Sequence, residues 1–132
     1  MGYMFYGASA FDQDLSKWDV SALTYTGYMF SDASAFNQDL SKWDVAGVTD
    51  MGFMFSYAST FNQDLSKWDV SAVTNMYWMF AHAPAFNREL CGVAWANSKA
   101  DKNGMFTGSP GSIASTVCTT TTTGYAEGYG YD

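Results

Sequence analysis

Two aspartates five residues apart recur along the chain and could supply paired carboxylates. The pairs are Asp14 and Asp19, Asp39 and Asp44, and Asp64 and Asp69. Paired carboxylates perform glycoside hydrolysis, and rows of carboxylate oxygens bind Ca²⁺. A lysine stands between the aspartates of each pair (Lys17, Lys42 and Lys67), and identical copies favour a structural role over one active site. We therefore expect no catalytic residue, cofactor or metal site, while Ca²⁺ binding by the aspartate rows stays open.

His82 is the only histidine, so no second imidazole is available for a metal site or a catalytic triad. Its position in the repeat described below is otherwise held by Gly7, Asp32 and Tyr57, which indicates a variable, exposed site. The sequence therefore predicts that the protein is not an enzyme.

Cys91 and Cys118 are the two cysteines of the chain. A disulfide that ties the tail to the last repeat is the expected state, and two buried free thiols are the alternative. The bridge would close a loop of about 27 residues and stabilise the fold by roughly 3 kcal/mol in the chain-entropy model. It would place the protein in an oxidising environment, outside the cell or at its surface.

The sequence repeats every 25 residues, and this repeat sets the positions of most of the residues named above. Its apolar columns are Phe11, Phe36, Phe61 and Phe86; Leu15, Leu40, Leu65 and Leu90; Trp18, Trp43 and Trp68; Val20, Val45 and Val70; and Met29, Met54 and Met79. Such regularity predicts a solenoid whose coils are filled by the same interior side chains. We expect one short parallel strand per coil, as at residues 18–20, and one short helix or 3₁₀ turn, as at residues 49–55, with Thr49 as its N-cap.

The repeat unit FNQDLSKWDVSAVTNMYWMFAHAPA resembles that of BspA-like leucine-rich-repeat surface proteins, which is also found in mycoplasma surface lipoproteins. The motif VTDMGFMF carries the resemblance most specifically, and the similarity covers residues 1–106. It implies a leucine-rich-repeat-like, right-handed solenoid on the cell surface that serves as an adhesin or binding scaffold, with no catalytic residues.

The repeat degenerates from residue 91, where Val93 takes the place of the tryptophan and Trp95 that of the valine. We divide the chain into a solenoid at residues 1–106, partial at its start, and a C-terminal cap and Thr/Gly/Tyr-rich tail at residues 107–132. The tail threonines suit an extended strand or O-glycosylation, and docking and disorder are equally open. The candidate glycosylation sites are Thr116, Thr119, Thr120, Thr121, Thr122 and Thr123.

Composition excludes two partner classes. The net charge of −7 repels nucleic acid phosphates and anionic membranes. No apolar run approaches the roughly 20 residues that a membrane span needs, and the chain as given is expected to carry no signal peptide. Aromatic residues make up 18% of the chain and supply the apolar area for a packed core.

Met1 aligns with Met51 and Met76, so the chain begins inside a coil and the first coil would expose apolar side chains. Either the chain is a fragment of a longer solenoid, or a neighbouring copy completes the open end, with the tail as a donated strand. A head-to-tail contact of this kind propagates as a filament unless it closes into a ring.

Apolar residues off the core columns form the candidate assembly or ligand surface: Met1, Tyr3, Tyr25, Tyr28, Tyr57, Tyr77, Trp78, Tyr125, Tyr129 and Tyr131. We expect a non-catalytic extracellular structural protein, the subunit of a filament or surface layer in which copies bind head to tail, with O-glycosylation open. The alternative is a cell-surface adhesin that recognises a glycan or a protein.

Overall fold

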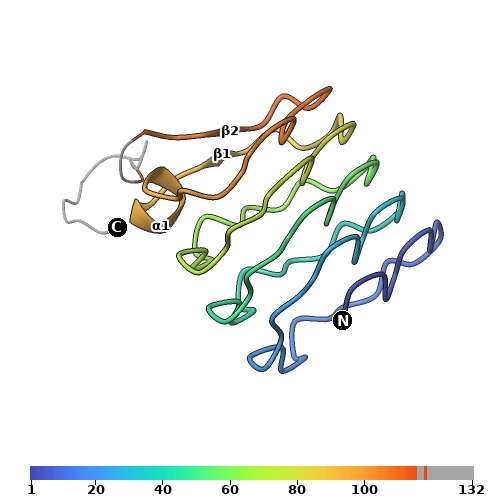
Figure 1. Ribbon diagram of the computed structural model, residues 1–132. Helices are drawn as coiled ribbons and strands as arrows, with labels where there is room; N and C mark the ends of the chain where they lie inside the picture. The colour runs from blue at the N-terminus through green and yellow to red at the C-terminus, as the bar shows by residue number, and fades with distance from the viewer. Residues whose placement is uncertain (116–117, 119–132) are drawn as a thin grey trace, which may run out of the picture.

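The computed structural model describes residues 1–115 and 118, and these residues wind into a stack of similar coils (Figure 1). We number the coils from the N-terminus: coil 1 is residues 1–25, coil 2 is 26–50, coil 3 is 51–75, coil 4 is 76–101, and coil 5 begins at residue 102. Regular elements occur only at the C-terminal end of the described chain. They are β1 (Glu89–Leu90), α1 (Val93–Ala96) and β2 (Ser112–Ile113), and β2 pairs in parallel with β1.

Backbone hydrogen bonds join the coils along one edge of the stack. From coil 2 to coil 3, the donors are the N–H groups of Tyr28, Phe30 and Asp32, and the acceptors are the C=O groups of Gly52, Met54 and Ser56, at 2.9–3.0 Å. The N–H of Thr26 donates to the C=O of Asp50, the last residue of its own coil, at 3.0 Å. The alternate N–H groups, of Met29, Ser31 and Ala33, instead close turns onto the C=O groups of Thr26, Tyr28 and Phe30. We call this edge, at residues 1–8, 26–33, 51–58, 76–83 and 102–109, the rung edge.

The segment at residues 49–55 forms successive turns and not the predicted helix or 3₁₀ turn. Phe53 has a φ of 59°, in the left-handed region, and every second N–H from Phe53 onward donates to coil 4, so neither helical dihedrals nor helical hydrogen bonds can continue. Thr49 is not an N-cap: its hydroxyl donates to the C=O of Thr24 at 3.2 Å, in the preceding coil.

The predicted strand at residues 18–20 and its equivalents is also absent from the structure. The side-chain alternation was correct in the inner coils, where Trp43 and Val45 are buried and Asp44 is exposed. Side chains join the coils here, because the indole Nε1 of Trp43 donates to the C=O of Leu15 at 2.9 Å. Apart from β1 and β2, the described parallel pairing is a row of single bridges through Tyr25, Asp50, Asn75 and Asp101.

Two columns of stacked phenylalanine rings fill the interior. Phe30 stacks on Phe55 in the next coil, with ring centroids 5.5 Å apart, and on Phe36 in its own coil at 4.3 Å. The inner Phe ladder, as we call the first column, is Phe5, Phe30, Phe55, Phe80 and Phe106, and the second column is Phe11, Phe36, Phe61 and Phe86. In coils 1–4, each of these rings is in contact with a ring of its own coil and with rings of adjacent coils, which explains why the residue recurs unchanged.

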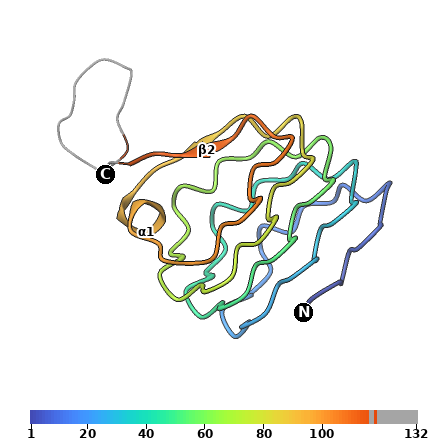
Figure 2. The same ribbon diagram turned by 45° about the horizontal axis from the view of Figure 1, so that its top comes forward.

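Coil 4 departs from the others through α1, which lies on the side of the stack away from the rung edge (Figures 1 and 2). The helix lets Trp95, and not Val93, occupy the tryptophan place: Trp95 is buried and its Nε1 donates to the C=O of Leu65 at 3.0 Å. The assignment of Trp95 to the valine position was therefore wrong, because the added turn shifts the register. Coil 5 continues past residue 106 through β2.

Trp18 corrects the expectation that the whole tryptophan column is interior. Its side chain is 38% exposed against 3% for Trp43, because no described residue packs over coil 1 from the N-terminal side.

The tryptophan column allows a matched test of the packing. Trp43→Ala removes a buried ring and the hydrogen bond to Leu15, so the free energy of unfolding should fall by about 3–5 kcal/mol. Trp18→Ala, at the exposed member of the column, should lower it by only about 1 kcal/mol. Chemical denaturation in dilute solution measures both, and equal losses would contradict this packing.

Candidate functional site

The paired aspartates stabilise turns and do not face a common site. The Asp14 carboxylate accepts the N–H of Ser16 at 2.8 Å, and that of Asp19 accepts the N–H and hydroxyl of Ser21 at 3.0 and 2.6 Å. The N–H of Ser16 is the main reason why the pKa of Asp14 lies below the usual range, and the Ser21 hydroxyl has this role for Asp19. The same turns recur at Asp39, Asp44, Asp64 and Asp69. Within residues 1–115 and 118, no three His, Cys, Asp or Glu side chains gather as a metal site would require.

A second polar column, which was not predicted from the sequence, links neighbouring coils. The Asp12 carboxylate accepts the N–H of Asn37 and the side-chain amide of Gln38, both at 2.9 Å. The Asn37 side-chain oxygen accepts the equivalent groups of Asn62 and Gln63 at 2.9 and 3.0 Å. The recurrence of Asn or Asp directly after each Phe of the second column was the signal for this ladder.

His82 has a packing role. Its ring stacks on Tyr57 at 4.7 Å and lies 5.6 Å from Trp78. On the other side, a Cβ at Gly108 would lie 2.9 Å from His82 Nδ1. The half-buried imidazole thus packs between Tyr57 and Gly108 of its own column and beside Trp78, and it has no carboxylate or thiol partner among the residues described.

Three of the predicted surface aromatics, Tyr3, Tyr28 and Trp78, lie in one outer ladder along the rung edge. Its rings are Tyr3, Tyr28, Phe53 and Trp78, with centroid distances of 4.7, 4.6 and 5.9 Å between successive members. Tyr77 packs against Phe53 at 5.5 Å, and Tyr57 is exposed and stacked on His82. Burial raises the pKa of Tyr28 and of Tyr25. The stacked rings cover one another's faces, so mainly their edges reach the solvent.

The largest exposed apolar area lies on coil 1, where we define the N-terminal face as Met1, Tyr3, Met4, Tyr6 and Trp18. Met4 is 51% exposed, whereas the equivalent Met29 and Met54 are fully buried. Of these five residues, Met1 and Tyr3 were predicted from the sequence to lie on the surface, whereas Met4, Tyr6 and Trp18 were not. The signal was available, because the first member of a buried column is the one that lacks a neighbour.

Two side grooves show no arrangement for catalysis. The larger, of about 510 Å³, lies between α1 and coil 3 and includes Val93, Lys99 and Asp69. The smaller, of about 230 Å³, is lined by Asp39, Asp64, Lys67 and Arg88 among others. Its carboxylates belong to the turns described above, and neither described lining includes a histidine or a cysteine.

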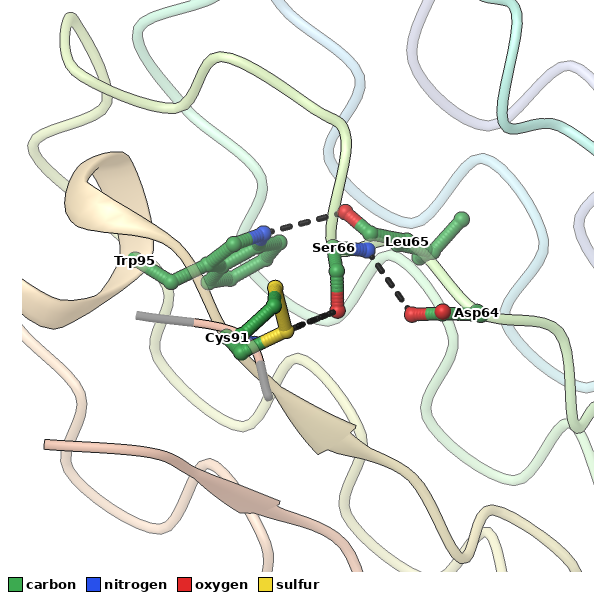
Figure 3. The surroundings of a disulfide bond; sticks show 6 residues. Asp64, Leu65, Ser66, Cys91 and Trp95 are labelled. Atoms are coloured by element: carbon green, nitrogen blue, oxygen red, sulfur yellow. Dashed lines mark hydrogen bonds between the residues drawn. A yellow bond between two sulfur atoms is a disulfide. The ribbon is translucent and has the colours of Figure 1, made fainter. Parts of the chain in front are cut away.

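A disulfide joins Cys91 to Cys118, with Cα atoms 4.8 Å apart (Figure 3). The Cys91 N–H donates to the Ser66 hydroxyl at 3.1 Å. Two further hydrogen bonds lie next to this contact: the Ser66 N–H donates to the Asp64 carboxylate, and the Trp95 indole donates to the C=O of Leu65. The bridge therefore attaches residue 118 where coil 4 packs on coil 3. The candidate glycosylation sites Thr116 and Thr119–Thr123, and Tyr125, Tyr129 and Tyr131, lie outside the described residues.

Comparison with family models matches residues 1–114 to the family described as "Mycoplasma protein of unknown function, DUF285". The chain belongs to the DUF285 family. The matched region of this DUF285 chain includes coils 1–4 and coil 5 through β2. Comparisons with curated proteins and with solved structures found no match. In the portion of the DUF285 chain that the structure describes, no helix has the length and apolar character needed to cross a membrane.

The aspartate turns predict acid sensitivity. The pKa values of Asp12, Asp14, Asp19, Asp39 and Asp69 are lowered in the folded state, so their stabilising effect is present above the unfolded pKa of about 3.9 and is lost as the pH falls below it. The melting temperature should hold from pH 7 to about 5 and fall between about 4.5 and 2.5.

Asparagine is the control for this prediction, because its side-chain oxygen forms the same turn at Asn75, where it accepts the Tyr77 N–H at 2.9 Å. A variant with asparagine at positions 14, 19, 39 and 69 should show a shallower decline with acid. An unchanged decline would contradict the assignment.

The disulfide predicts a redox-dependent stability. The double variant Cys91→Ser/Cys118→Ser should lose roughly 3 kcal/mol of unfolding free energy, as expected for a loop of this length. Dithiothreitol should lower the melting temperature of the unmodified chain and leave that of the double variant unchanged. No response to the reductant would contradict a stabilising bridge.

Proposed function

We propose that this chain is a non-catalytic structural protein whose copies bind head to tail, coil on coil, to build a filament or a surface layer. The observation that carries the proposal is the N-terminal face, where Met1, Met4, Tyr6 and Trp18 are exposed at positions that are buried in the inner coils. An apolar surface of this kind is typical of protein interaction sites. A contact between one end of a stack and the other end of a second copy is heterologous and therefore propagates.

The rest of the chemistry supports a structural role. The paired carboxylates are occupied by turn hydrogen bonds, and the single imidazole is enclosed by Tyr57, Trp78 and Gly108. The disulfide favours an extracellular or cell-surface location, because such bonds persist in oxidising compartments. Kinship with BspA-like surface proteins, a right-handed leucine-rich-repeat-like winding and O-glycosylation of the tail threonines are parts of the same proposal.

An adhesin that binds a glycan or a protein is the second candidate. The exposed ring of Tyr57 and the charged groove that contains Lys67 and Arg88 favour it. Sugars stack on the faces of aromatic rings, however, and in the outer ladder these faces pack against one another. Assembly therefore accounts for more of the exposed apolar area than ligand binding does.

Sedimentation velocity tests the proposal. The unmodified chain should form concentration-dependent polymers, visible as unbranched fibres by negative-stain electron microscopy. Met4→Lys puts a charge on the N-terminal face and should give discrete particles of 14.5 kDa, while its melting temperature stays close to that of the parent, because Met4 is half exposed. Ala72→Lys, with the same charge on the exposed side of coil 3, should still polymerise. A monomer at every concentration would refute head-to-tail assembly.

A further inference from the structure

Every pair of neighbouring coils is joined on the rung edge by the same three hydrogen bonds in the same direction. From coil 1 to coil 2, the N–H groups of Tyr3, Phe5 and Gly7 donate to the C=O groups of Gly27, Met29 and Ser31 at 3.1, 2.9 and 2.8 Å. From coil 4 to coil 5, those of Trp78, Phe80 and His82 donate to Asn103, Met105 and Thr107 at 3.1, 2.9 and 2.6 Å. On this edge the donors always lie on the earlier coil, so the two ends of the edge differ.

The two ends of the rung edge are therefore chemically opposite. On coil 1, the C=O groups of Gly2, Met4 and Tyr6 occupy the acceptor positions and receive no hydrogen bond from the described residues. On coil 5, the N–H groups of Gly104, Phe106 and Gly108 occupy the donor positions and have no acceptor among the described residues. Two like ends would bring acceptor against acceptor or donor against donor, whereas unlike ends complement each other.

The backbone of coil 5 already has the conformation needed for the same hydrogen bonds to form with coil 1 of a second copy. Gly104 and Gly108 have φ values of 67° and 71°, close to the 54° and 56° of Trp78 and His82 at the same places in coil 4. On coil 1, Tyr3 and Gly7 have 65° and 70°. A second copy would thus meet an edge shaped like the one that every inner coil presents to its neighbour.

The inner Phe ladder also ends on both faces. Phe5 and Phe106 are its terminal rings, both only partly buried, and successive centroids along the ladder lie 5.4–5.6 Å apart. With the rung bonds formed between copies, Phe106 of one copy would stack on Phe5 of the next at this spacing. The exposed Met4 would then be covered as Met29 and Met54 are.

We propose that copies join in this register: the N–H groups of Gly104, Phe106 and Gly108 donate to the C=O groups of Gly2, Met4 and Tyr6 of the next copy. The inference rests on the proposed head-to-tail assembly and adds its atomic register. In this register the filament is one uninterrupted stack to which each copy contributes five coils. At about 4.8 Å per coil, the axial repeat of the filament is about 24 Å.

Engineered cysteines test the register. Tyr6 and Thr107 share a column with Ser31 and Ser56, whose hydroxyl oxygens lie 2.8 Å apart across coils 2 and 3, so neighbours in this column touch. The full chain with Tyr6→Cys and Thr107→Cys should therefore form, under mild oxidation, a ladder of covalent multimers on a non-reducing gel. Mass spectrometry of the digested multimers should find a disulfide between the peptides that contain positions 6 and 107, and Cys91 should still be joined to Cys118.

The matched control is Tyr6→Cys with Asn103→Cys, in which the second cysteine is displaced by four residues along the exposed part of coil 5. It should assemble without the covalent ladder. Filaments that cross-link through positions 6 and 103, or through neither pair, would overturn the register and leave head-to-tail assembly standing. Absence of assembly in the unmodified chain would overturn both. Electron cryomicroscopy of the filaments should show the repeat of about 24 Å, and a different repeat would exclude this joint.

Discussion

The structure depends on the division of backbone N–H groups along the rung edge. Alternate N–H groups close turns within a coil, and the intervening ones donate to the next coil, so a segment with neither helix nor sheet still satisfies its hydrogen-bonding groups. This arrangement requires a left-handed φ at two places per coil, as at Tyr28 and Asp32. For residues other than glycine this conformation is uncommon, and it persists here because the neighbouring coil fixes the backbone on both sides.

The side-chain columns follow from this spacing. The backbone hydrogen bonds of the rung edge repeat between all coils. They hold the Phe rings of the inner ladder 5.4–5.6 Å apart and nearly parallel, so each ring needs the same ring above and below it. On the other side of the coil, hydrogen bonds from the indole groups of Trp43, Trp68 and Trp95 to backbone C=O groups join neighbouring coils. A change in one coil is therefore felt by its two neighbours, as in other stacked repeats.

Columns could be predicted from the sequence, whereas local backbone structure could not. Periodicity identified Trp43, Phe36 and Met54 as interior residues, because it reports which side chains recur in one environment. It did not reveal the turns, since an aromatic residue such as Phe53 or Trp78 gives no sign of a left-handed φ. Gly7, Gly104 and Gly108 stand at the same places and were the available signal. The position of Trp95 was not predicted because α1 shifts the register of coil 4. The exposure of Trp18 was not predicted because periodicity carries no information about which coil lies at the end of the stack.

A polar stack of self-similar coils has complementary ends by construction, so a subunit that is to stay alone must cover one of them. Natural solenoids use a cap with a polar outer face. Here α1, the irregular part of coil 4, lies on the side of the stack away from the rung edge (Figure 1). Cys91, which precedes α1, is joined to Cys118. Within the described chain, this part of coil 4 leaves the N–H groups of Gly104, Phe106 and Gly108 without an acceptor and the ring of Phe106 partly exposed. Among the described residues, the departure of coil 4 from the repeat thus stabilises the last coils without closing the edge along which a further coil would add.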